Sequence, residues 1–475
     1  MSMPLNTPNI SEKTISKVYI ESFGCQMNDQ DMARMLTLVK GDYSRTDEPD
    51  NADLILVNTC SIRDKAEQKL YSTVGRFKSL KEANKGLLIG ITGCVAQQEG
   101  EGLLKRMPYV DMVIGTQNLQ KLPAIIDDLT QKRVDKAVYI DRYKEIQEDE
   151  FETVPYSENP YKAHLTIMRG CDKVCTFCIV PRVRGREVCR KSSDILDEVF
   201  VLRDRGIKEI TLLGQTVTSY SPLTGGDSTF AELINKVAEV EGIERVRFTS
   251  PHPIDFINSG SELISVLAEE RKICSSIHMP LQSGSNAVLK AMKRGYTIEE
   301  YLDSVNTLKK AYEARGRHYA ITTDMIVGFP GETDKDFEDT MKALEDVRFD
   351  GMYSFIFSPR PKTAAAGYTD GMVEKSVASE RLSKLQARHK EISFEKSALL
   401  EGTTQEILVE GESRNNPDED NILMGRTECN RIVNFKGEAS MEGSLKKVKV
   451  TKVFKNSLWG ELCGVTPSGG EPCLS

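Results

Sequence analysis

Short apolar runs alternate with helical stretches along most of this chain, and this alternation restricts its fold more than any other feature. Runs at 17–23, 52–58, 87–92 and 110–114 predict strands, and intervening segments such as 29–40 and 65–81 carry helix formers at helical spacing. Six further strands are predicted at 164–168, 209–213, 245–249, 276–281, 321–327 and 352–357. Alternating strands and helices are typical of parallel sheets covered by helices. The chain therefore predicts an N-terminal parallel-sheet α/β domain and a central partial (β/α)6 barrel.

The pattern changes after Gly402, where short strands are predicted at 404–409, 431–435 and 445–454 between turns rich in Gly, Asn, Pro and acidic residues. This arrangement is typical of a small antiparallel β-barrel. An acidic, proline-bearing stretch upstream predicts a linker. The 475 residues are thus expected to form an N-terminal domain at 16–134, a linker at 135–156, a central barrel domain at 157–391, a terminal barrel at 392–463 and a loose tail at 464–475.

Hydropathy and charge restrict where the protein works. No apolar run approaches the ~20 residues that cross a bilayer, and the first 17 residues lack an apolar signal core, so we expect a soluble, cytoplasmic protein without a membrane partner. The net charge of −8 gives no overall electrostatic case for nucleic acid. Two local basic clusters nevertheless suit phosphate contacts with RNA: Lys173, Arg182, Arg184, Arg186, Arg190 and Lys191, and Lys446, Lys447, Lys449, Lys452 and Lys455.

Three of the 11 cysteines, Cys171, Cys175 and Cys178, form a C-x-x-x-C-x-x-C sequence just beyond the first strand of the predicted central barrel. Three thiolates on one tight loop can each bind one iron of a cubic cluster and leave the fourth iron open. The alternative is a structural zinc loop with Cys189 as a fourth ligand. Closed zinc sites favour two-residue gaps and a second ligand pair, so the spacing favours an iron–sulfur cluster.

A second set, Cys25, Cys60 and Cys94, lies at the ends of three predicted strands of the N-terminal domain. The carboxyl ends of parallel strands lie on the same edge of a sheet, where open α/β sheets assemble ligand sites. Gly24 and Gly93 would let the backbone approach a bulky cluster closely. Buried cysteines that only fill a core are the alternative. Their equivalent strand-end positions favour a second three-ligand cluster.

The cysteine triplet, with Phe177 before its last member, resembles the signature of the radical S-adenosylmethionine superfamily. The resemblance implies that the amino and carboxylate groups of S-adenosylmethionine chelate the open iron. It also implies that an electron from the cluster splits the sulfonium to a 5′-deoxyadenosyl radical.

Two three-cysteine sets followed by a β-rich domain resemble the methylthiotransferases within this superfamily, over residues 17–462. The sequence Gly24-Cys25-Gln26-Met27-Asn28 is similar to the branch that modifies isopentenylated adenosine in tRNA. Further matches are Pro251-His252-Pro253, Pro280-Leu281-Gln282-Ser283-Gly284-Ser285, Met292-Lys293-Arg294-Gly295-Tyr296-Thr297 and Ser358-Pro359-Arg360-Pro361. The stretch Gly425-Arg426-Thr427-Glu428-Cys429-Asn430-Arg431 is close to the pattern of the RNA-binding TRAM domain, although Cys429 stands where a polar residue is expected.

This resemblance implies a reaction in two halves, both using S-adenosylmethionine. One molecule methylates a sulfur at the N-terminal, auxiliary 4Fe-4S cluster, and another yields the radical that removes hydrogen from carbon 2 of N(6)-isopentenyladenosine at position 37 of tRNA. The carbon radical then takes the methylthio group. The target base must be unstacked and held between the two clusters. The implied partners are this tRNA and an electron donor such as flavodoxin or ferredoxin.

Further site residues are expected on strand-end loops. Gly214 and Gln215 occupy the place where this superfamily often binds the amino group of S-adenosylmethionine, although a structural turn fits them too. Gln282, Ser283 and Glu332 lie on the catalytic face of such a barrel and are candidates for contact with cofactor or substrate. No catalytic side chain beyond the cluster ligands is predicted.

Two other functions compete with this interpretation. The same chemistry acts on threonylcarbamoyladenosine in tRNA or on an aspartate of a ribosomal protein in other branches, which resemble this chain less at Gln26-Met27-Asn28. A non-catalytic RNA-binding protein with structural iron or zinc is the other alternative. Three-cysteine sets without an obvious fourth ligand weigh against it, since structural sites are normally closed.

Overall fold

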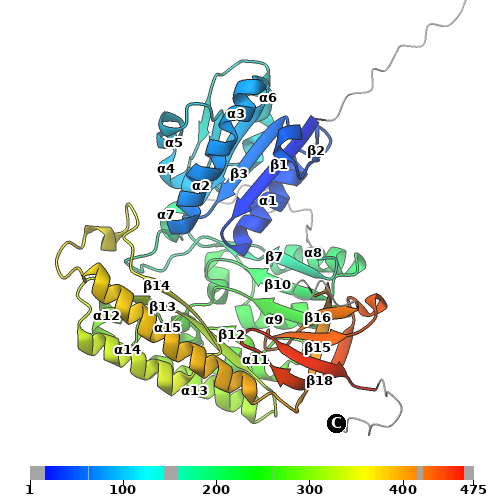
Figure 1. The fold of residues 1–475 in the computed structure, drawn as a ribbon, viewed down its shortest axis with the longest axis vertical. Coiled ribbons are helices and arrows are strands. Elements are labelled where there is room, and N and C mark those ends of the chain that lie inside the picture. Colours follow the sequence, from blue (N-terminus) through cyan, green and yellow to red (C-terminus); the bar gives the residue numbers. More distant parts are fainter. Residues whose placement is uncertain (1–15, 62–63, 144–158, 260, 414–420, 465–475) are drawn as a thin grey trace, which may run out of the picture. The chain divides into compact units, whose positions relative to one another are not determined.

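The computed structural model describes residues 16–61, 64–143, 159–259, 261–413 and 421–464 (Figure 1). The chain forms two compact units, Met1–Val154 and Pro155–Ser475. The second unit therefore contains both the predicted central barrel and the predicted terminal barrel.

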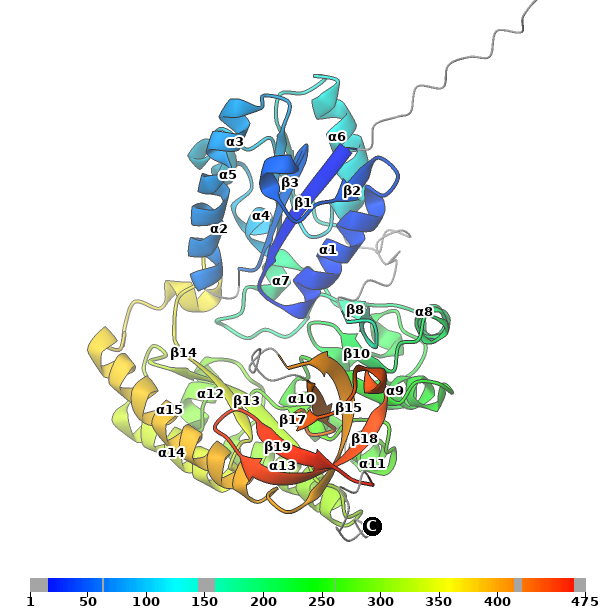
Figure 2. The ribbon, with the colours of Figure 1, turned by 45° about the vertical axis from the view of Figure 1, so that its right-hand side comes forward.

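The first unit is built on a six-stranded, fully parallel sheet with the order β2-β1-β3-β4-β5-β6. Its strands are β1 (Ser16–Phe23), β2 (Tyr43–Arg45), β3 (Leu54–Thr59), β4 (Leu88–Gly93), β5 (Met112–Ile114) and β6 (Ala137–Tyr139). Its helices are α1 (Gln26–Leu38), α2 (Asp64–Arg76), α3 (Lys78–Ala83), α4 (Cys94–Glu99), α5 (Glu101–Arg106) and α6 (Leu122–Thr130). Figure 2 shows α1 and α2 on opposite faces of the sheet. Both faces are covered, and β3 is accordingly buried at every position.

The four predicted strands are the inner part of this sheet, and the α/β prediction is confirmed. The structure adds two three-residue edge strands, β2 and β6, which are too short to carry a periodic signal. Strand β6 falls inside the range predicted as linker, because Ala137 to Tyr139 pair with β5.

The larger part of the second unit is a partial barrel of six parallel strands. Strands β7 (Lys162–Thr166), β10 (Glu209–Leu213) and β11 (Arg245–Phe248) form one half, and β12 (Ser276–His278), β13 (Ala320–Val327) and β14 (Gly351–Ile356) form the other. A parallel bridge between Val246 and Ile273 joins the two halves. The short strands β8 (Met168–Arg169) and β9 (Val188–Cys189) pair antiparallel beside β7. The prediction of a six-stranded partial barrel is therefore confirmed.

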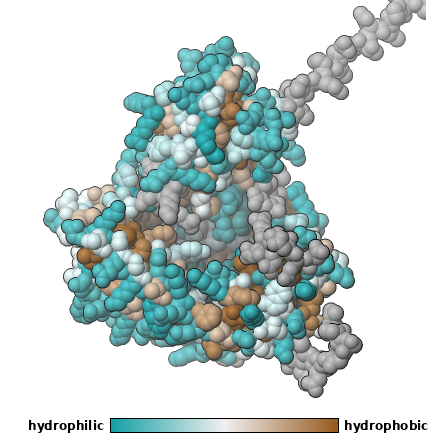
Figure 3. Space-filling view, in the orientation of Figure 1, coloured by the Kyte–Doolittle hydropathy of each residue, from teal (hydrophilic) through white to brown (hydrophobic). Residues whose placement is uncertain are grey.

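Helices connect and cover these strands. They are α7 (Val180–Val183), α8 (Ser192–Asp204), α9 (Phe230–Glu239), α10 (Pro253–Asn258), α11 (Ser261–Glu269), α12 (Asn286–Ala291), α13 (Ile298–Glu313), α14 (Asp334–Val347) and α15 (Lys375–Ala398). The predicted capping box is present, since Thr333 and Asp336 satisfy each other's backbone N–H at the start of α14. The outward faces of α13, α14 and α15 are mostly hydrophilic (Figure 3), as expected for helices with one face on a core.

The terminal part of this unit is a closed five-stranded barrel with the order β15-β16-β17-β19-β18. Its strands are β15 (Thr404–Glu412), β16 (Ile422–Thr427), β17 (Ile432–Lys436), β18 (Leu445–Val453) and β19 (Leu458–Leu462). Ile407, Val433, Phe435 and Val448 fill its interior. The predicted small barrel is confirmed; its strands pair antiparallel except β17 and β19, which run parallel.

Two arginines of the partial barrel hold the terminal barrel in place. Arg245 donates hydrogen bonds to the carbonyl oxygens of Arg426 and Glu406 at 2.6 and 3.0 Å, and Arg247 donates to those of Glu428 and Thr427 at 3.0 and 2.9 Å. These arginines lie on β11, so the terminal barrel packs against that side of the partial barrel.

A buried carboxylate lies beneath this contact. Glu209 on β10 is 1% exposed, with Lys162 Nζ 3.1 Å from Oε1 and Arg247 Nε 3.0 Å from Oε2. Lys162 also pairs with Glu410 of the terminal barrel at 2.9 Å.

The same interface explains the unusual residue of the TRAM-like stretch. Cys429 is buried, and its Sγ lies 3.3 Å from Ser275 Oγ of the partial barrel. A small, weakly polar side chain suits this packed position.

None of the helices in the described part of the chain combines the length and the apolar character that crossing a membrane requires.

Candidate functional site

The cysteine triplet lies on a tight loop between β8 and α7. Gly170, which precedes it, has φ +75°, and a Cβ there would lie 1.8 Å from the carbonyl oxygen of Arg186. The N–H of Cys171 donates to the carbonyl of Gly185 at 3.1 Å, and the N–H of Cys178 donates to that of Cys175 at 3.1 Å. The backbone at the start of the cysteine loop therefore has room only for glycine.

The loop that follows β10 supports this cysteine loop. Gln215 accepts a hydrogen bond from the N–H of Gly170 through Oε1, and Thr216 donates from Oγ1 to Cys171 Sγ at 3.1 Å. A Cβ on Gly214 would lie 2.6 Å from Met168 Cγ, so the backbone passes close to β8. Gly214 and Gln215 thus hold the loop that carries Cys171. Their contact with S-adenosylmethionine stays a prediction.

Cys175 faces the buried guanidinium of Arg294, a residue of the matching stretch at 292–297 to which the sequence alone assigns no role. Arg294 is 5% exposed and donates from Nη1 to Cys175 Sγ at 3.3 Å and from Nη2 to the carbonyl of Pro280 at 2.7 Å. Its Nε donates to Tyr296 Oη at 3.1 Å. Burial opposes the charge, but Tyr296 and Cys175 outweigh it and raise the pKa of Arg294.

A second nitrogen also approaches Cys175. His252 Nε2 lies 3.9 Å from Cys175 Sγ, while Nδ1 accepts a hydrogen bond from the N–H of Ile254 at 3.3 Å. Burial, followed by the charge of Arg294, lowers the pKa of His252 to about 2, so the ring is neutral. Because Nδ1 is an acceptor, we assign the proton to Nε2, which faces the sulfur.

The chemistry of this loop fits an iron–sulfur cluster. Burial raises the pKa of Cys171, and burial followed by the neighbouring Cys175 raises the pKa of Cys178 to about 12, so a bound cation is needed to hold thiolates there. Cys189, the fourth zinc ligand of the alternative, is buried with Sγ 3.0 Å from Thr224 Oγ1. In the described part of the chain, no three His, Cys, Asp or Glu side chains are arranged around one metal ion. A cubic cluster does not require three side chains around one ion, since each thiolate binds its own iron.

The cysteines of the first unit lie at the ends of three adjacent strands. Phe23 of β1 pairs with Thr59 of β3, and Thr59 pairs with Gly93 of β4, so these strands end in register. Cys60 and Cys94 follow directly, and Cys25 follows two residues after β1. The predicted strand-end arrangement is what the structure shows; the cluster itself stays a prediction.

Glycine is required beside these cysteines. Gly24 has φ +133°, and a Cβ there would lie 2.3 Å from Cys60 Cβ. Gly93 has φ +89°, and its Cβ would lie 2.6 Å from the carbonyl oxygen of Thr59. The backbones that carry Cys25, Cys60 and Cys94 are therefore packed directly against one another.

Two asparagines hold the loop of Cys25 onto β3. Asn28 Nδ2 donates to the carbonyl of Phe23 at 2.9 Å, and Asn58 Nδ2 donates to the carbonyl of Asn28 at 2.8 Å. Both asparagines are fully buried. Asn28 thus has a positional role in the Cys25-Gln26-Met27-Asn28 motif.

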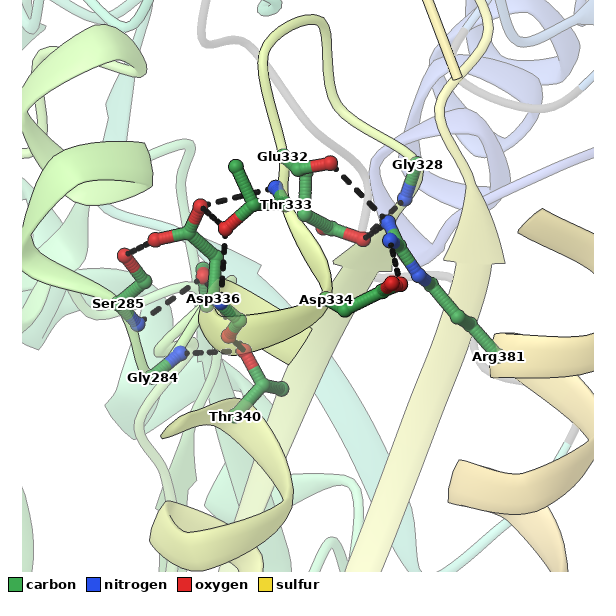
Figure 4. Close-up of polar contacts among 10 residues, drawn as sticks. Gly284, Ser285, Gly328, Glu332, Thr333, Asp334, Asp336, Thr340 and Arg381 are labelled. Atoms are coloured by element: carbon green, nitrogen blue, oxygen red, sulfur yellow. Dashed lines mark hydrogen bonds and ion pairs between the residues drawn. The ribbon is translucent and has the colours of Figure 1, made fainter. Parts of the chain in front are cut away.

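The remaining predicted site residues lie on the loops after β12 and β13, and Figure 4 shows how these loops are joined. Glu332 accepts from the N–H of Gly328 at 3.0 Å and from Arg381 Nη1 at 2.6 Å, and burial raises its pKa. Ser283 Oγ is fully buried 3.2 Å from Thr340 Oγ1. Gln282 has φ +76° and extends the pairing with β13 through its backbone. These residues fix the loops; their contact with cofactor or substrate stays a prediction.

The basic cluster around the triplet is only partly exposed: Arg182, Arg186 and Lys191 are exposed, and their contact with RNA stays a prediction. Arg190 is buried and pairs with Glu198 at 2.8 Å, and Arg184 is also buried. Lys173 pairs with Asp255 at 2.6 Å. Lys447, Lys449, Lys452 and Lys455 of the second cluster are exposed on or beside β18.

Three families match separate parts of the chain. Residues 17–115 match the uncharacterized protein family UPF0004, residues 165–344 match the radical SAM superfamily and residues 398–463 match the TRAM domain.

The fold of the chain is similar to solved radical S-adenosylmethionine enzymes. The methyltransferase TsrM from Kitasatospora setae, with tryptophan and a S-adenosylmethionine analogue bound, has a TM-score of 0.51 at 10% identity, over 82% of this chain and 78% of that one. The cobalamin-dependent enzyme OxsB has a TM-score of 0.50 at 15% identity, over 78% of this chain and 56% of that one. These similarities concern the fold alone.

Curated relatives are similar over nearly the whole chain. Proteins named tRNA-2-methylthio-N(6)-dimethylallyladenosine synthase are 47% identical in Geobacter sulfurreducens, over 95% of this chain and 98% of the relative, and 44% identical in Vibrio cholerae, over 94% and 92%. The relative of that name in Coxiella burnetii is 43% identical over 94% of this chain and all of its own length. The chain therefore belongs to the tRNA-2-methylthio-N(6)-dimethylallyladenosine synthase family of radical SAM enzymes.

Proposed function

We propose that this protein is a radical SAM transferase that adds a methylthio group to carbon 2 of N(6)-isopentenyladenosine at position 37 of tRNA, giving 2-methylthio-N(6)-isopentenyladenosine. The observation that carries this proposal is the identity of 43–47% with relatives of that name over nearly the full chain, with all three regions retained.

We assign one 4Fe-4S cluster to Cys171, Cys175 and Cys178. When bound there, it would supply the electron that cleaves S-adenosylmethionine to the radical that removes hydrogen from carbon 2. The chain's own contribution is positional: Gly170 lets the loop close, and Gln215 fixes the start of the loop from the end of β10. We place the S-adenosylmethionine beside this loop, with Gly214, Gln215, Gln282, Ser283 and Glu332 as candidates for its environment.

We assign a second 4Fe-4S cluster, which carries the transferred sulfur, to Cys25, Cys60 and Cys94. The shared register of β1, β3 and β4 and the close packing around Gly24 and Gly93 support this assignment. The reaction requires that one unstacked base reach both clusters.

We expect the terminal barrel to bind tRNA. The exposed lysines of β18 can neutralise phosphates there, whereas the TRAM-like stretch at 425–431 is largely used to contact the partial barrel. We further propose that a small reducing protein such as flavodoxin or ferredoxin supplies the electron and that the reaction takes place in the cytoplasm.

Iron counting tests the two cluster assignments. We expect the anaerobically reconstituted protein to hold about eight irons, and Cys25→Ala and Cys171→Ala each to lose about half of them. Cys463→Ala is a matched control, because Cys463 belongs to neither set and should keep all the iron. If one variant loses all the iron and the other loses none, the two-cluster assignment is wrong.

Mass analysis of nucleosides from hypomodified tRNA tests the substrate. We expect the methylthio mark on isopentenyladenosine. A mark on threonylcarbamoyladenosine, or on a ribosomal protein aspartate, would replace this substrate with one of the alternatives.

Production of 5′-deoxyadenosine tests whether the protein is an enzyme at all. We expect the reconstituted protein to form it from S-adenosylmethionine and dithionite. Failure to form any would favour a non-catalytic RNA-binding protein.

A further inference from the structure

We propose that Arg294 and Thr216 set the reduction potential of the cluster held by Cys171, Cys175 and Cys178, by donating hydrogen bonds to two of its three ligand sulfurs. The inference rests on the proposed function, since it requires a cluster on these cysteines.

The Arg294 guanidinium is held where it must face the cluster. It is 5% exposed, and its other nitrogens are fixed by the carbonyl of Pro280 and by Tyr296 Oη, which leaves Nη1 directed at Cys175 Sγ at 3.3 Å. The cysteine loop is anchored to the same segment, because Thr176 donates from its N–H to the carbonyl of Met292 at 3.0 Å and from Oγ1 to that of Ala291 at 3.0 Å. The guanidinium of Arg294 and the loop that carries Cys175 are therefore both fixed in position, and this fixes the distance between Nη1 and Sγ.

A second, neutral donor acts on another ligand. Thr216 is 2% exposed, and its Oγ1 lies 3.1 Å from Cys171 Sγ. The neutral ring of His252 is farther away, with Nε2 3.9 Å from Cys175 Sγ, and adds a weaker dipole.

The physical reason is the charge that reduction adds. One electron passes from an external reductant to the cluster, no proton moves and no bond changes, so the site becomes more negative by one charge. A buried cation next to a ligand sulfur stabilises the more negative state, and hydrogen bonds to the sulfurs are among the main determinants of cluster potentials. Removing the Arg294 charge must therefore make reduction harder.

A purely structural role for Arg294 predicts a different result. The side chain also holds the carbonyl of Pro280, so its loss should loosen the loop after β12 whatever it does to the cluster. Stability measurements do not separate the two roles, whereas a reduction potential does.

The experiment is an EPR-monitored redox titration of the full-length protein in which Cys25, Cys60 and Cys94 are replaced by Ala, so that one cluster contributes the signal. In this background, Arg294→Met should lower the ratio of reduced to oxidised cluster at a fixed potential by about tenfold, a shift of about 59 mV to more negative potential for one electron. Arg294→Lys keeps the charge, so its reduction potential should stay close to that of the background protein. Thr216→Val should shift the potential in the same direction by less, and Thr216→Ser should not.

Arg317→Met is the matched control. Arg317 is equally buried, donates to the carbonyls of Leu267 and Ile273, and pairs with the carboxylate of Glu428. It should leave the potential unchanged. Equal potentials for the Arg294→Met variant and its background, at about four irons per chain in both, would overturn the inference and leave the proposed function intact. If Arg294→Met fails to bind iron, Thr216→Val decides, and an unchanged potential in Thr216→Val would then refute the inference. A background protein that binds no iron would overturn both the inference and the cluster assignment.

Discussion

Glu209→Gln should destabilise the second unit by about 3 kcal/mol at neutral pH. The Glu209 carboxylate is 1% exposed, and two cations lie 3.0–3.1 Å from its oxygens. Burial alone would raise its pKa, but Arg247 and Lys162 outweigh burial and lower the pKa from the ordinary 4.5 to about 2. At about 1.4 kcal/mol per pKa unit, this difference corresponds to about 3 kcal/mol of stability. Removing one partner of a buried pair costs about 3–5 kcal/mol, which agrees.

The dependence on pH has a defined sign. A carboxyl group whose pKa is lowered by folding stabilises the folded state above its unfolded pKa, here 4.5, and loses that effect as the pH falls toward 2. The stability difference between the wild type and Glu209→Gln should therefore shrink by about 1 kcal/mol between pH 7 and pH 4, and by about 2 kcal/mol at pH 3.

Urea unfolding, monitored by tryptophan fluorescence, measures the stability of the second unit, because the only tryptophan of the chain, Trp459, lies on β19 of the terminal barrel. Asp111→Asn is the control: Asp111 is a buried carboxylate paired with Lys81 at 2.7 Å in the first unit. It should leave the Trp459 transition unchanged. A Glu209→Gln protein within 1 kcal/mol of the wild type at pH 7, or a difference that stays constant down to pH 3, would refute the reasoning.

Two further variants test the other parts of the chain. Gly93→Ala should lose the iron of the first unit and destabilise that unit by more than about 2 kcal/mol, because the new Cβ would lie 2.6 Å from the Thr59 carbonyl oxygen at a positive φ. Gly75→Ala on α2 is the control, because the space around its Cβ is open, and it should be neutral or slightly stabilising. Thermal unfolding and iron analysis measure both variants. Lys449→Glu on β18 should weaken tRNA binding and make the slope of log K, the logarithm of the binding constant, against log[salt] shallower by about 1. Filter binding at several salt concentrations measures this slope. An unchanged slope would exclude this face of the terminal barrel from phosphate contact.

The parts of the fold that the sequence predicts well are those with a strong local pattern. The inner strands of the first unit and the six strands of the partial barrel carry apolar runs long enough to be recognised. The predicted helix at 65–81 is divided at Phe77 into α2 and α3, since Phe77 is buried as the segment turns. Strands β16 and β19 were not predicted, because their short runs are interrupted by Gly425 and Gly460, where a strand crosses its neighbour closely.

The site divides in the same way. The cysteines are recognisable because their spacing or strand-end position is itself a pattern. Arg294 and Thr216 are not, because they reach the sulfurs from segments 119 and 45 residues away in the chain. The basic residues near the triplet were expected to face RNA, but charge patterns do not distinguish an exposed arginine from Arg190, which is buried with its own carboxylate partner.

The two barrels of the second unit contribute different kinds of atoms to the hydrogen bonds of Arg245 and Arg247. To Arg245 and Arg247 the terminal barrel offers main-chain oxygens, at 426–428 and at Glu406, which every amino acid possesses. Elsewhere in the contact it also uses side chains, since Glu410 pairs with Lys162 and Glu428 with Arg317. Substitutions at Arg426 can thus change the side chain at this edge while the carbonyl of residue 426 still accepts from Arg245, whereas a residue with fewer donors in place of Arg245 or Arg247 removes hydrogen bonds across the contact.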